Sequence, residues 1–271
     1  MIEVKNLSKF FGPVPAVNRI SFRVQKGEIL GFLGPNGAGK STSMRMITGF
    51  LPPSGGTAVI GGHDIQTAPV AARKRIGYLP ENAPVYPDMT VFGYLDFCAR
   101  IRGFSGAERR RRVGETIERC FLSGVEHQTV STLSKGFKQR VCFAQSILHD
   151  PEYLILDEPT DGLDPNQKFQ VRELIRSMGD TKAIIISTHI LEEVDAVCDR
   201  TIIIDHGKIV SDGTPAQLHA RSPEHNAVTL RIPVADIAKT TEVLKALPEI
   251  AEVETKEQGE HNASLFVRPR N

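Results

Sequence analysis

A glycine-rich segment near the N-terminus constrains the fold of this chain more than any other feature. From Gly34 it reads Gly-Pro-Asn-Gly-Ala-Gly-Lys-Ser-Thr, ending at Thr42, and it contains the pattern G-x-x-x-x-G-K-S. The continuous apolar run 29–33 precedes this segment, and residues 43–50 follow it with helical spacing. Because an unbroken apolar run of this length is typical of a strand buried on both faces, we predict a buried strand, a loop and a helix, in that order.

The loop has the composition of a phosphate-binding P-loop. Its glycines allow successive backbone N–H groups to point inward, and the N-terminus of the following helix adds partial positive charge. Lys40 is predicted to reach the β- and γ-phosphates of ATP, Ser41 to coordinate Mg²⁺, and Thr42 to cap the helix or contact the α-phosphate. The alternative is a glycine turn beside a solvated lysine, and the strand-loop-helix context argues against it. The predicted nucleotide-binding residues are Gly34, Pro35, Asn36, Gly37, Ala38, Gly39, Lys40, Ser41 and Thr42.

Two adjacent acids, Asp157 and Glu158, follow a second apolar run at 153–156. Alone, this pattern favours two exposed acids at a strand end. The carboxyl ends of neighbouring parallel strands meet at one edge of a sheet, so both acids are expected close to the P-loop. Asp157 is then predicted to belong to the Mg²⁺ shell, and Glu158 to align and polarise the attacking water.

The remaining pattern predicts an α/β fold with three parts. Apolar runs at 153–156 and 183–186 flank a helical stretch at 166–178, which is a βαβ crossover and implies a parallel core sheet. Residues 2–24 alternate in polarity, which predicts an antiparallel β subdomain. A helix-rich, more polar stretch at about 85–150 predicts a helical subdomain. Within it, Val113, Ile117 and Phe121 recur at four-residue intervals, which predicts a helix at 107–121 with these residues on one face.

A change of pattern after residue 223 predicts a second, smaller domain. Residues 228–267 read as strand, helix, strand and strand. We therefore expect a first domain at 1–223 and a small α+β C-terminal extension at 224–271, which resembles part of a ferredoxin-like unit.

Composition narrows the possible functions. There are 33 basic and 32 acidic side chains, so the formal net charge is +1, without the basic excess typical of nucleic-acid binders. No apolar stretch approaches the ~18–20 residues of a membrane-spanning helix, and residue 1 already begins a strand pattern, which leaves no room for a signal peptide.

The run 109–112 consists of four arginines beside glutamates, and we expect it to form a solvated, ion-paired helix face. Binding to anionic lipid is the alternative for that run.

Four further segments, in the right order, resemble motifs of the ABC ATPase family. They resemble its Q-loop region, its signature sequence, its D-loop and its switch histidine, and the resemblance covers residues 1 to about 220. It implies a P-loop NTPase fold of the ABC ATPase type. The segments are Ile76-Gly77-Tyr78-Leu79-Pro80-Glu81, Leu133-Ser134-Lys135-Gly136-Phe137-Lys138-Gln139-Arg140, Thr160-Asp161-Gly162-Leu163-Asp164 and Ser187-Thr188-His189.

The resemblance also implies a site shared between two copies of the chain. Ser134 and Gly136 begin a helix whose positive end would face the γ-phosphate bound by a second subunit, in a head-to-tail homodimer around two ATP molecules. His189 would contact the γ-phosphate and the water, and Asp164 would contact the opposing subunit. Phe11 matches the aromatic residue, more often tyrosine, that stacks on adenine; the alternative is that Phe11 is a core residue.

One residue departs from the family pattern. Glu81 stands where the family usually has glutamine. A carboxylate accepts hydrogen bonds but donates none, and it adds negative charge. Glu81 would either ligate the metal together with Ser41 and Asp157, or pair with a cation on the membrane partner.

The sequence therefore predicts a Mg²⁺-dependent ATPase subunit of an ABC transporter that powers separate integral membrane permease subunits. Such a subunit is cytoplasmic and peripheral at the inner face of the cell membrane. Segments 78–84, 133–136 and 164–167 look like those of ABC-2 type exporters, in the gliding-motility and multidrug-export branch. One alternative is a soluble ABC ATPase acting on nucleic acid or ribosomes, which the single cassette and balanced charge disfavour. Another is a regulatory module without turnover, which the intact acids and histidine disfavour.

Overall fold

The computed structural model describes residues 1–82, 84–221, 227–259 and 262–270. The chain forms two compact units, Met1–Pro215 and Ala216–Asn271. The first unit has two large apolar clusters, and the second has a small one of its own. The domain boundary predicted between residues 223 and 224 lies outside the described residues.

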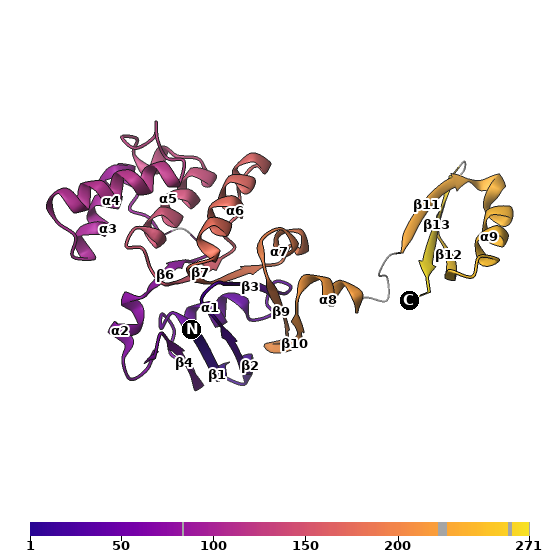
Figure 1. Ribbon diagram of the computed structural model, residues 1–271, viewed down its shortest axis with the longest axis horizontal. Helices are drawn as coiled ribbons and strands as arrows, with labels where there is room; N and C mark the ends of the chain where they lie inside the picture. The colour runs from indigo at the N-terminus through magenta and orange to yellow at the C-terminus, as the bar shows by residue number, and fades with distance from the viewer. Residues whose placement is uncertain (83, 222–226, 260–261, 271) are drawn as a thin grey trace. The chain divides into compact units, whose positions relative to one another are not determined.

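At the centre of the first unit, six described strands form a sheet in the order β10-β9-β3-β8-β7-β6 (Figure 1). Its neighbouring strands run parallel, apart from the antiparallel hairpin of β9 and β10. Every residue of β7 and β8 is buried, which explains their unbroken apolar sequences and confirms the predicted parallel core. The strands are β3 (Glu28–Leu33), β6 (Ile76–Leu79), β7 (Tyr153–Asp157), β8 (Ala183–Thr188), β9 (Arg200–Asp205) and β10 (Lys208–Gly213).

Strand register brings the predicted site segments to one edge of this sheet. Leu33, the last residue of β3, pairs with Thr188, the last residue of β8. Asp157, the last residue of β7, pairs with Ser187. The loops that follow these three strands therefore begin side by side, as the carboxyl ends of parallel strands must.

A second, antiparallel sheet packs on the other side of helix α1 (Lys40–Ile47). Met44, Met46 and Ile47 of this helix are fully buried, within a cluster that draws residues from both sheets. The helix was predicted at 43–50, but it begins at Lys40 because the P-loop leads directly into it, and Gly49 follows it with a φ of 68°. The strands, in the order β2-β1-β4-β5, are β1 (Ile2–Phe11), β2 (Val14–Val24), β4 (Gly55–Ile60) and β5 (His63–Asp64).

The helix-rich stretch forms its own group around α5 (Lys135–Ile147), α3 (Val91–Ile101) and α4 (Gly106–Arg119) (Figure 1). Val113 and Ile117 of α4 are buried as their spacing predicts. Phe121 was expected on the same face, but α4 ends at Arg119 and Phe121 is 41% exposed. The other elements of this unit are α2 (Pro69–Lys74), η1 (Val130–Thr132), α6 (Pro165–Gly179) and α7 (Leu191–Val197), while α8 (Pro215–Ala220) begins at the last residue of this unit and otherwise belongs to the second.

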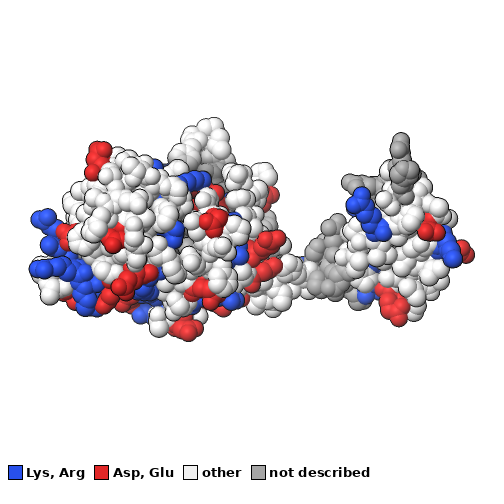
Figure 2. Space-filling model, turned by 90° about the horizontal axis from the view of Figure 1, so that it is seen from above, with Lys and Arg blue, Asp and Glu red and all other residues white. Residues whose placement is uncertain are grey.

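The arginine run lies on α4 and is extensively ion-paired. Figure 2 shows lysine and arginine gathered at the end of the first unit that carries α3 and α4 in Figure 1. Arg112 contacts Glu108 at 2.6 Å, the i,i+4 pair expected from the sequence. Arg109 contacts Asp96 at 2.7 Å, and Arg111 contacts Glu115 at 2.7 Å. These contacts support the interpretation as a solvated helix face.

In its described residues, the second unit contains, after α8, a three-stranded antiparallel sheet and one further α-helix. Strand β13 (Asn262–Pro269) lies between β11 (Val228–Pro233) and β12 (Ile250–Gln258), while η2 (Val234–Asp236) and α9 (Ile237–Lys245) connect the two outer strands. This is the split βαβ arrangement from which ferredoxin-like units are built. Within the part of the chain that the structure describes, no helix has the length and apolar character that crossing a bilayer requires.

Candidate active site

Two glycines allow the backbone conformation of the loop between β3 and α1. Gly39 has a φ of 106°, and a methyl group there would come within 2.5 Å of the carbonyl oxygen of Ala16. A methyl group on Gly34 would come within 2.3 Å of the carbonyl oxygen of Ile204. Larger residues at either position would therefore displace the loop that carries Pro35, Asn36, Gly37 and Ala38.

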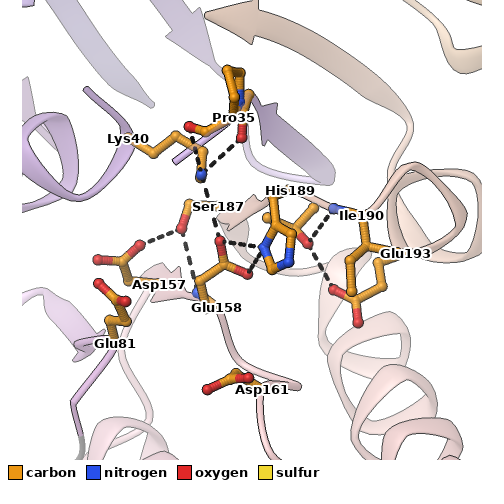
Figure 3. A network of polar contacts seen from close by, with 12 residues as sticks. Pro35, Lys40, Glu81, Asp157, Glu158, Asp161, Ser187, His189, Ile190 and Glu193 are labelled. Atoms are coloured by element: carbon orange, nitrogen blue, oxygen red, sulfur yellow. Dashed lines mark hydrogen bonds and ion pairs between the residues drawn. The ribbon is translucent and has the colours of Figure 1, made fainter. Parts of the chain in front are cut away.

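Lys40 lies at the centre of the site and is only 6% exposed. Its ammonium group donates to the carbonyl oxygens of Gly34 at 2.8 Å and Pro35 at 3.3 Å. The Oε1 atom of Glu158 lies 3.6 Å away, so one cation links the P-loop to the acid at the end of β7 (Figure 3). The predicted convergence of these two segments is therefore seen directly.

Asp157 is fully buried, and its two oxygens differ in their surroundings. Its Oδ1 atom accepts hydrogen bonds from the hydroxyls of Ser187 and Ser41, the latter at 3.2 Å. Its Oδ2 atom has no partner among the described residues. Burial raises the pKa of the Asp157 carboxyl and the Glu81 charge acts in the same direction, whereas the two serine hydroxyls oppose the shift.

These oxygens fit a divalent cation. The hydroxyl of Ser41 lies 3.2 Å from Asp157 and 3.4 Å from the Oε2 atom of Glu81, so a hydroxyl and two carboxylates converge on one place. Mg²⁺ prefers oxygen ligands and is usually held by one or two carboxylates together with substrate phosphates. The unpaired Oδ2 atom of Asp157 is the buried acceptor that such an ion would satisfy.

Glu158 is held in place by both its backbone and its carboxylate. Its φ of 50° lies in the left-handed region, which costs of order 1 kcal/mol for a residue other than glycine and is most often seen at functional sites. Its carboxylate lies 3.1 Å from Nδ1 of His189, measured to either oxygen (Figure 3). Burial raises the pKa of the Glu158 carboxyl, and His189 and Lys40 oppose that shift. A carboxylate that is both buried and oriented is well suited to act as a base.

Two polar residues of this site lie in segments that resemble family motifs, but no role in the site was predicted for either. Ser187 donates to Asp157, and its backbone carbonyl accepts the N–H of Glu158 at 3.1 Å. Gln139, in α5, donates to the Glu158 carbonyl at 3.2 Å. Ser187 could have been found because it interrupts an apolar strand at the position that pairs with Asp157. Gln139 gives no such signal, because only the packing of α5 against this loop brings it close.

Ser134 and Asp164 lie on the surface, away from this cluster of contacts. Ser134 is exposed and caps α5, where its hydroxyl accepts the N–H of Phe137 at 3.3 Å. Asp164 is exposed and caps α6 in the same way, through the N–H of Gln167 at 2.9 Å. Within the described part of the chain, no hydrogen bond or ion pair joins either residue to the Lys40 loop.

Gly136 and Phe11 also have defined surroundings. Gly136 is buried, and a methyl group on it would come within 2.6 Å of the Gln167 side chain. Phe11, the last residue of β1, is 53% exposed, with the ammonium of Lys9 5.5 Å from its ring centroid. The alternative that Phe11 is a core residue is therefore wrong.

A buried carboxylate behind the site, Glu193, was also missed. It is 5% exposed and lies on α7, where it accepts hydrogen bonds from the hydroxyls of Thr160 at 2.5 Å and Thr188 at 2.8 Å. Lys168 of α6 contacts it at 3.3 Å. Glu193 thus ties the segments that carry Glu158 and His189 to two helices, and its sequence neighbourhood gives no sign of this.

Replacing Glu193 with alanine is expected to destabilise the protein by about 2 kcal/mol or more, because two buried hydroxyls and a lysine lose their shared acceptor. Urea unfolding followed by circular dichroism would measure this loss. Glu192→Ala, at the neighbouring exposed position of the same helix, is the matched control and should change stability little. Equal stability of the two variants would contradict the role given to Glu193.

The fold and the site together define a P-loop nucleotide-binding cassette. A family model for ABC transporters matches residues 17–161, more than half of the chain. The chain belongs to the ABC transporter family, and it is an ATP-binding and ATP-hydrolysing subunit of that family.

Several curated relatives share most of the chain. The linearmycin resistance ATP-binding protein LnrL of Bacillus subtilis is 36% identical over 82% of this chain and 71% of its own length. The daunorubicin/doxorubicin resistance ATP-binding protein DrrA of Streptomyces peucetius is 37% identical over 85% of this chain and 70% of its own. These relatives support the transporter interpretation over action on nucleic acid or ribosomes.

Solved structures agree with the fold. The structure of an ATP-binding subunit of an ABC transporter superposes with a TM-score of 0.76 at 30% identity, covering 83% of this chain and 95% of that one. The ATP-binding cassette MJ0796, bound to ADP and phosphate, has a TM-score of 0.74 at 23% identity, covering 79% and 99% respectively, and this likeness concerns the fold alone. The α/β fold predicted from the sequence is confirmed.

Proposed function

We propose that this chain closes as a homodimer around two molecules of ATP with Mg²⁺, and that this closure drives separate membrane-spanning permease subunits of an exporter. The convergence of Lys40, Ser41, Asp157, Glu158 and His189 on one sheet edge carries the proposal. Relatives named for drug resistance support export, and the substrate belongs to the permease. The chain then works at the inner face of the cell membrane.

Each residue has a role that its position supports. Gly34–Thr42 hold the phosphates through backbone N–H groups, Lys40 reaches the β- and γ-phosphates, and exposed Phe11 stacks on adenine. Ser41, Asp157 and Glu81 would hold Mg²⁺, which when bound neutralises charge on the phosphate oxygens.

Hydrolysis depends on Glu158 and His189. Glu158 orients the attacking water and accepts its proton, since its carboxylate is buried and faces Lys40. His189 holds that carboxylate through Nδ1 and contacts the γ-phosphate. Positioning and charge neutralisation provide most of the rate of phosphoryl transfer, so these groups suffice once the site is closed.

A single chain leaves this site open on one side. Ser134 and Gly136 begin α5, a helix of 13 residues whose N-terminus carries partial positive charge, yet no described contact links them to the P-loop of the same chain. A second copy related by a two-fold axis would bring this helix end to the γ-phosphate, with Asp164 at the contact. Each ATP would then be held by the P-loop of one copy and the Ser134 end of the other.

The permease is proposed to dock on two adjoining grooves, one of 1010 Å³ beside α3 and one of 560 Å³ between α1, β6 and the helical part. Their walls combine aromatic and aliphatic side chains with arginine and lysine, which suits an amphipathic helix of a membrane protein. The lining includes Tyr86, Phe97, Ile101, Arg73, Lys74 and Arg102.

The loop after β6 connects these grooves to the site. Pro80 and Asn82 line the smaller groove, while the residue between them, Glu81, faces Ser41. If docking of the permease shifts this loop, the positions of the metal ligand Glu81 and of the bound nucleotide change with it. The loop would then couple ATP binding to movement of the permease.

Mixing two inactive variants tests the shared site. Lys40→Ala impairs the P-loop half, and Ser134→Glu places a negative charge where the second half meets the γ-phosphate. In a mixed dimer both defects fall in one site and the other site is intact, so random pairing leaves roughly a quarter of all sites complete. We expect single-turnover ATP hydrolysis to reappear on mixing.

The control is Lys40→Ala mixed with the double variant Lys40→Ala/Ser134→Glu, which has no complete site in any pairing. Hydrolysis in the first mixture no higher than in this control would reject a site shared between two copies. Single-turnover conditions are used because they do not require both sites of one dimer to act.

A further inference from the structure

Two carboxylates from different strands share one hydroxyl at the metal side of the site. Glu81 follows β6 and Asp157 ends β7, and their oxygens lie 3.4 Å and 3.2 Å from the hydroxyl oxygen of Ser41. Figure 3 shows the carboxylates of Glu81 and Asp157 next to each other, below Ser187 and beside Glu158. Asp157 is fully buried and has one oxygen without a partner among the described residues.

Negative charge is in excess around the Ser41 hydroxyl. Glu81, Asp157 and Glu158 are all acids. Lys40 and His189 both contact Glu158, whereas the positive charge of Arg45 acts on Asp157 only from beyond contact distance. Among the described residues, no lysine or arginine lies within ion-pair distance of Glu81 or Asp157. A triphosphate entering beside these acids is repelled unless a cation accompanies or precedes it, and the repulsion is stronger in a partly buried site than in water.

The geometry points to a divalent-cation site that fills before the nucleotide binds, with Glu81, Asp157 and Ser41 as its protein ligands. This inference rests on the proposed function and adds an order of binding to it. A glutamine in place of Glu81 would offer a neutral oxygen, whereas the carboxylate adds a second negative charge to the ligand set. The affinity of oxygen-ligand sites rises with the number of charged ligands, so Glu81 is the residue that permits metal binding to the nucleotide-free chain.

The competing role for Glu81 is an ion pair with a cation of the membrane partner. In that case Glu81 contributes nothing to metal affinity in the isolated chain. The two roles are therefore separated by measuring metal binding to the purified full chain without nucleotide.

Mn²⁺ is the probe, because its free form gives an electron paramagnetic resonance signal that is lost on binding. We expect the nucleotide-free chain at fixed pH to bind one Mn²⁺ saturably, and excess Mg²⁺ to displace it. Glu81→Gln should raise the dissociation constant about tenfold or more, and Asp157→Asn should do the same. Glu118→Gln, an identical change at an exposed residue of α4, is the matched control and should bind Mn²⁺ as the unchanged chain does.

Thermal unfolding of each variant shows whether it is folded, and Glu81 is exposed, so Glu81→Gln should unfold as the unchanged chain does. Equal Mn²⁺ affinities for Glu81→Gln and Glu118→Gln would overturn the inference, as would Mn²⁺ binding that appears only with nucleotide. Equal affinities would also remove Glu81 from the proposed Mg²⁺ ligands, but neither outcome affects the proposed closure around ATP, which fails separately if the unchanged chain does not bind ATP in the presence of Mg²⁺.

Discussion

Glu158→Gln should lower the turnover of ATP by about 10²- to 10⁴-fold while ATP still binds, because it removes the base and keeps the shape of the side chain. The buried carboxylate 3.1 Å from His189 is the group that can accept a proton from water in this site. Steady-state phosphate release measures the turnover, and binding of a fluorescent ATP analogue measures the affinity.

A second consequence of Glu158→Gln is accumulation of the closed dimer, since ATP binds but is not consumed. Size-exclusion chromatography with ATP and Mg²⁺ should show the variant as a dimer under conditions in which the unchanged chain is largely monomeric. The matched control is Glu192→Gln, an exposed residue on α7. If Glu158→Gln and Glu192→Gln turn over ATP at equal rates, Glu158 is not the base.

Lys40→Ala is expected to weaken ATP binding by at least about 2 kcal/mol, roughly 30-fold in the dissociation constant, because a buried ammonium that faces the phosphates is lost. Lys40 is 6% exposed and is positioned by two carbonyl oxygens of its own loop, so the nucleotide meets a preformed charge. Isothermal titration calorimetry with ATP and Mg²⁺ measures the change.

Lys208→Ala removes an exposed lysine from β10 and should leave ATP affinity unchanged. Comparing the two variants separates loss of the phosphate contact from loss of one positive charge on the molecule. An unchanged dissociation constant in Lys40→Ala would contradict the P-loop assignment itself, and with it the proposed function.

Much of the site could be predicted from local pattern. The P-loop is contiguous in sequence, and its glycines, lysine and serine are required by the phosphate group that they bind, so Gly34–Thr42 could be named before any fold was known. Asp157 and Glu158 could be placed beside them because apolar runs of strand length imply a parallel sheet, and parallel strands end at one edge. The structure confirms this placement through the Lys40–Glu158 contact.

Predictions made from helical spacing were less accurate at the ends of elements. α1 begins three residues earlier than expected, because the loop glycines lead straight into it, and α4 ends before Phe121. Periodicity reports which face of a helix is buried but not where the helix stops, since its ends depend on capping and on residues with positive φ.

Sequence alone determined the chemistry of this protein: a phosphate loop, two acids and a histidine in the order of an ATP-hydrolysing cassette, with Glu81 in place of the usual glutamine. Tertiary structure alone decided which residues support that chemistry. Gln139, Ser187 and Glu193 contact the catalytic segments through pairings between strands and helices distant in the chain. A hydrogen bond between distant segments depends on how the elements pack, and that packing cannot be read from residue type and spacing.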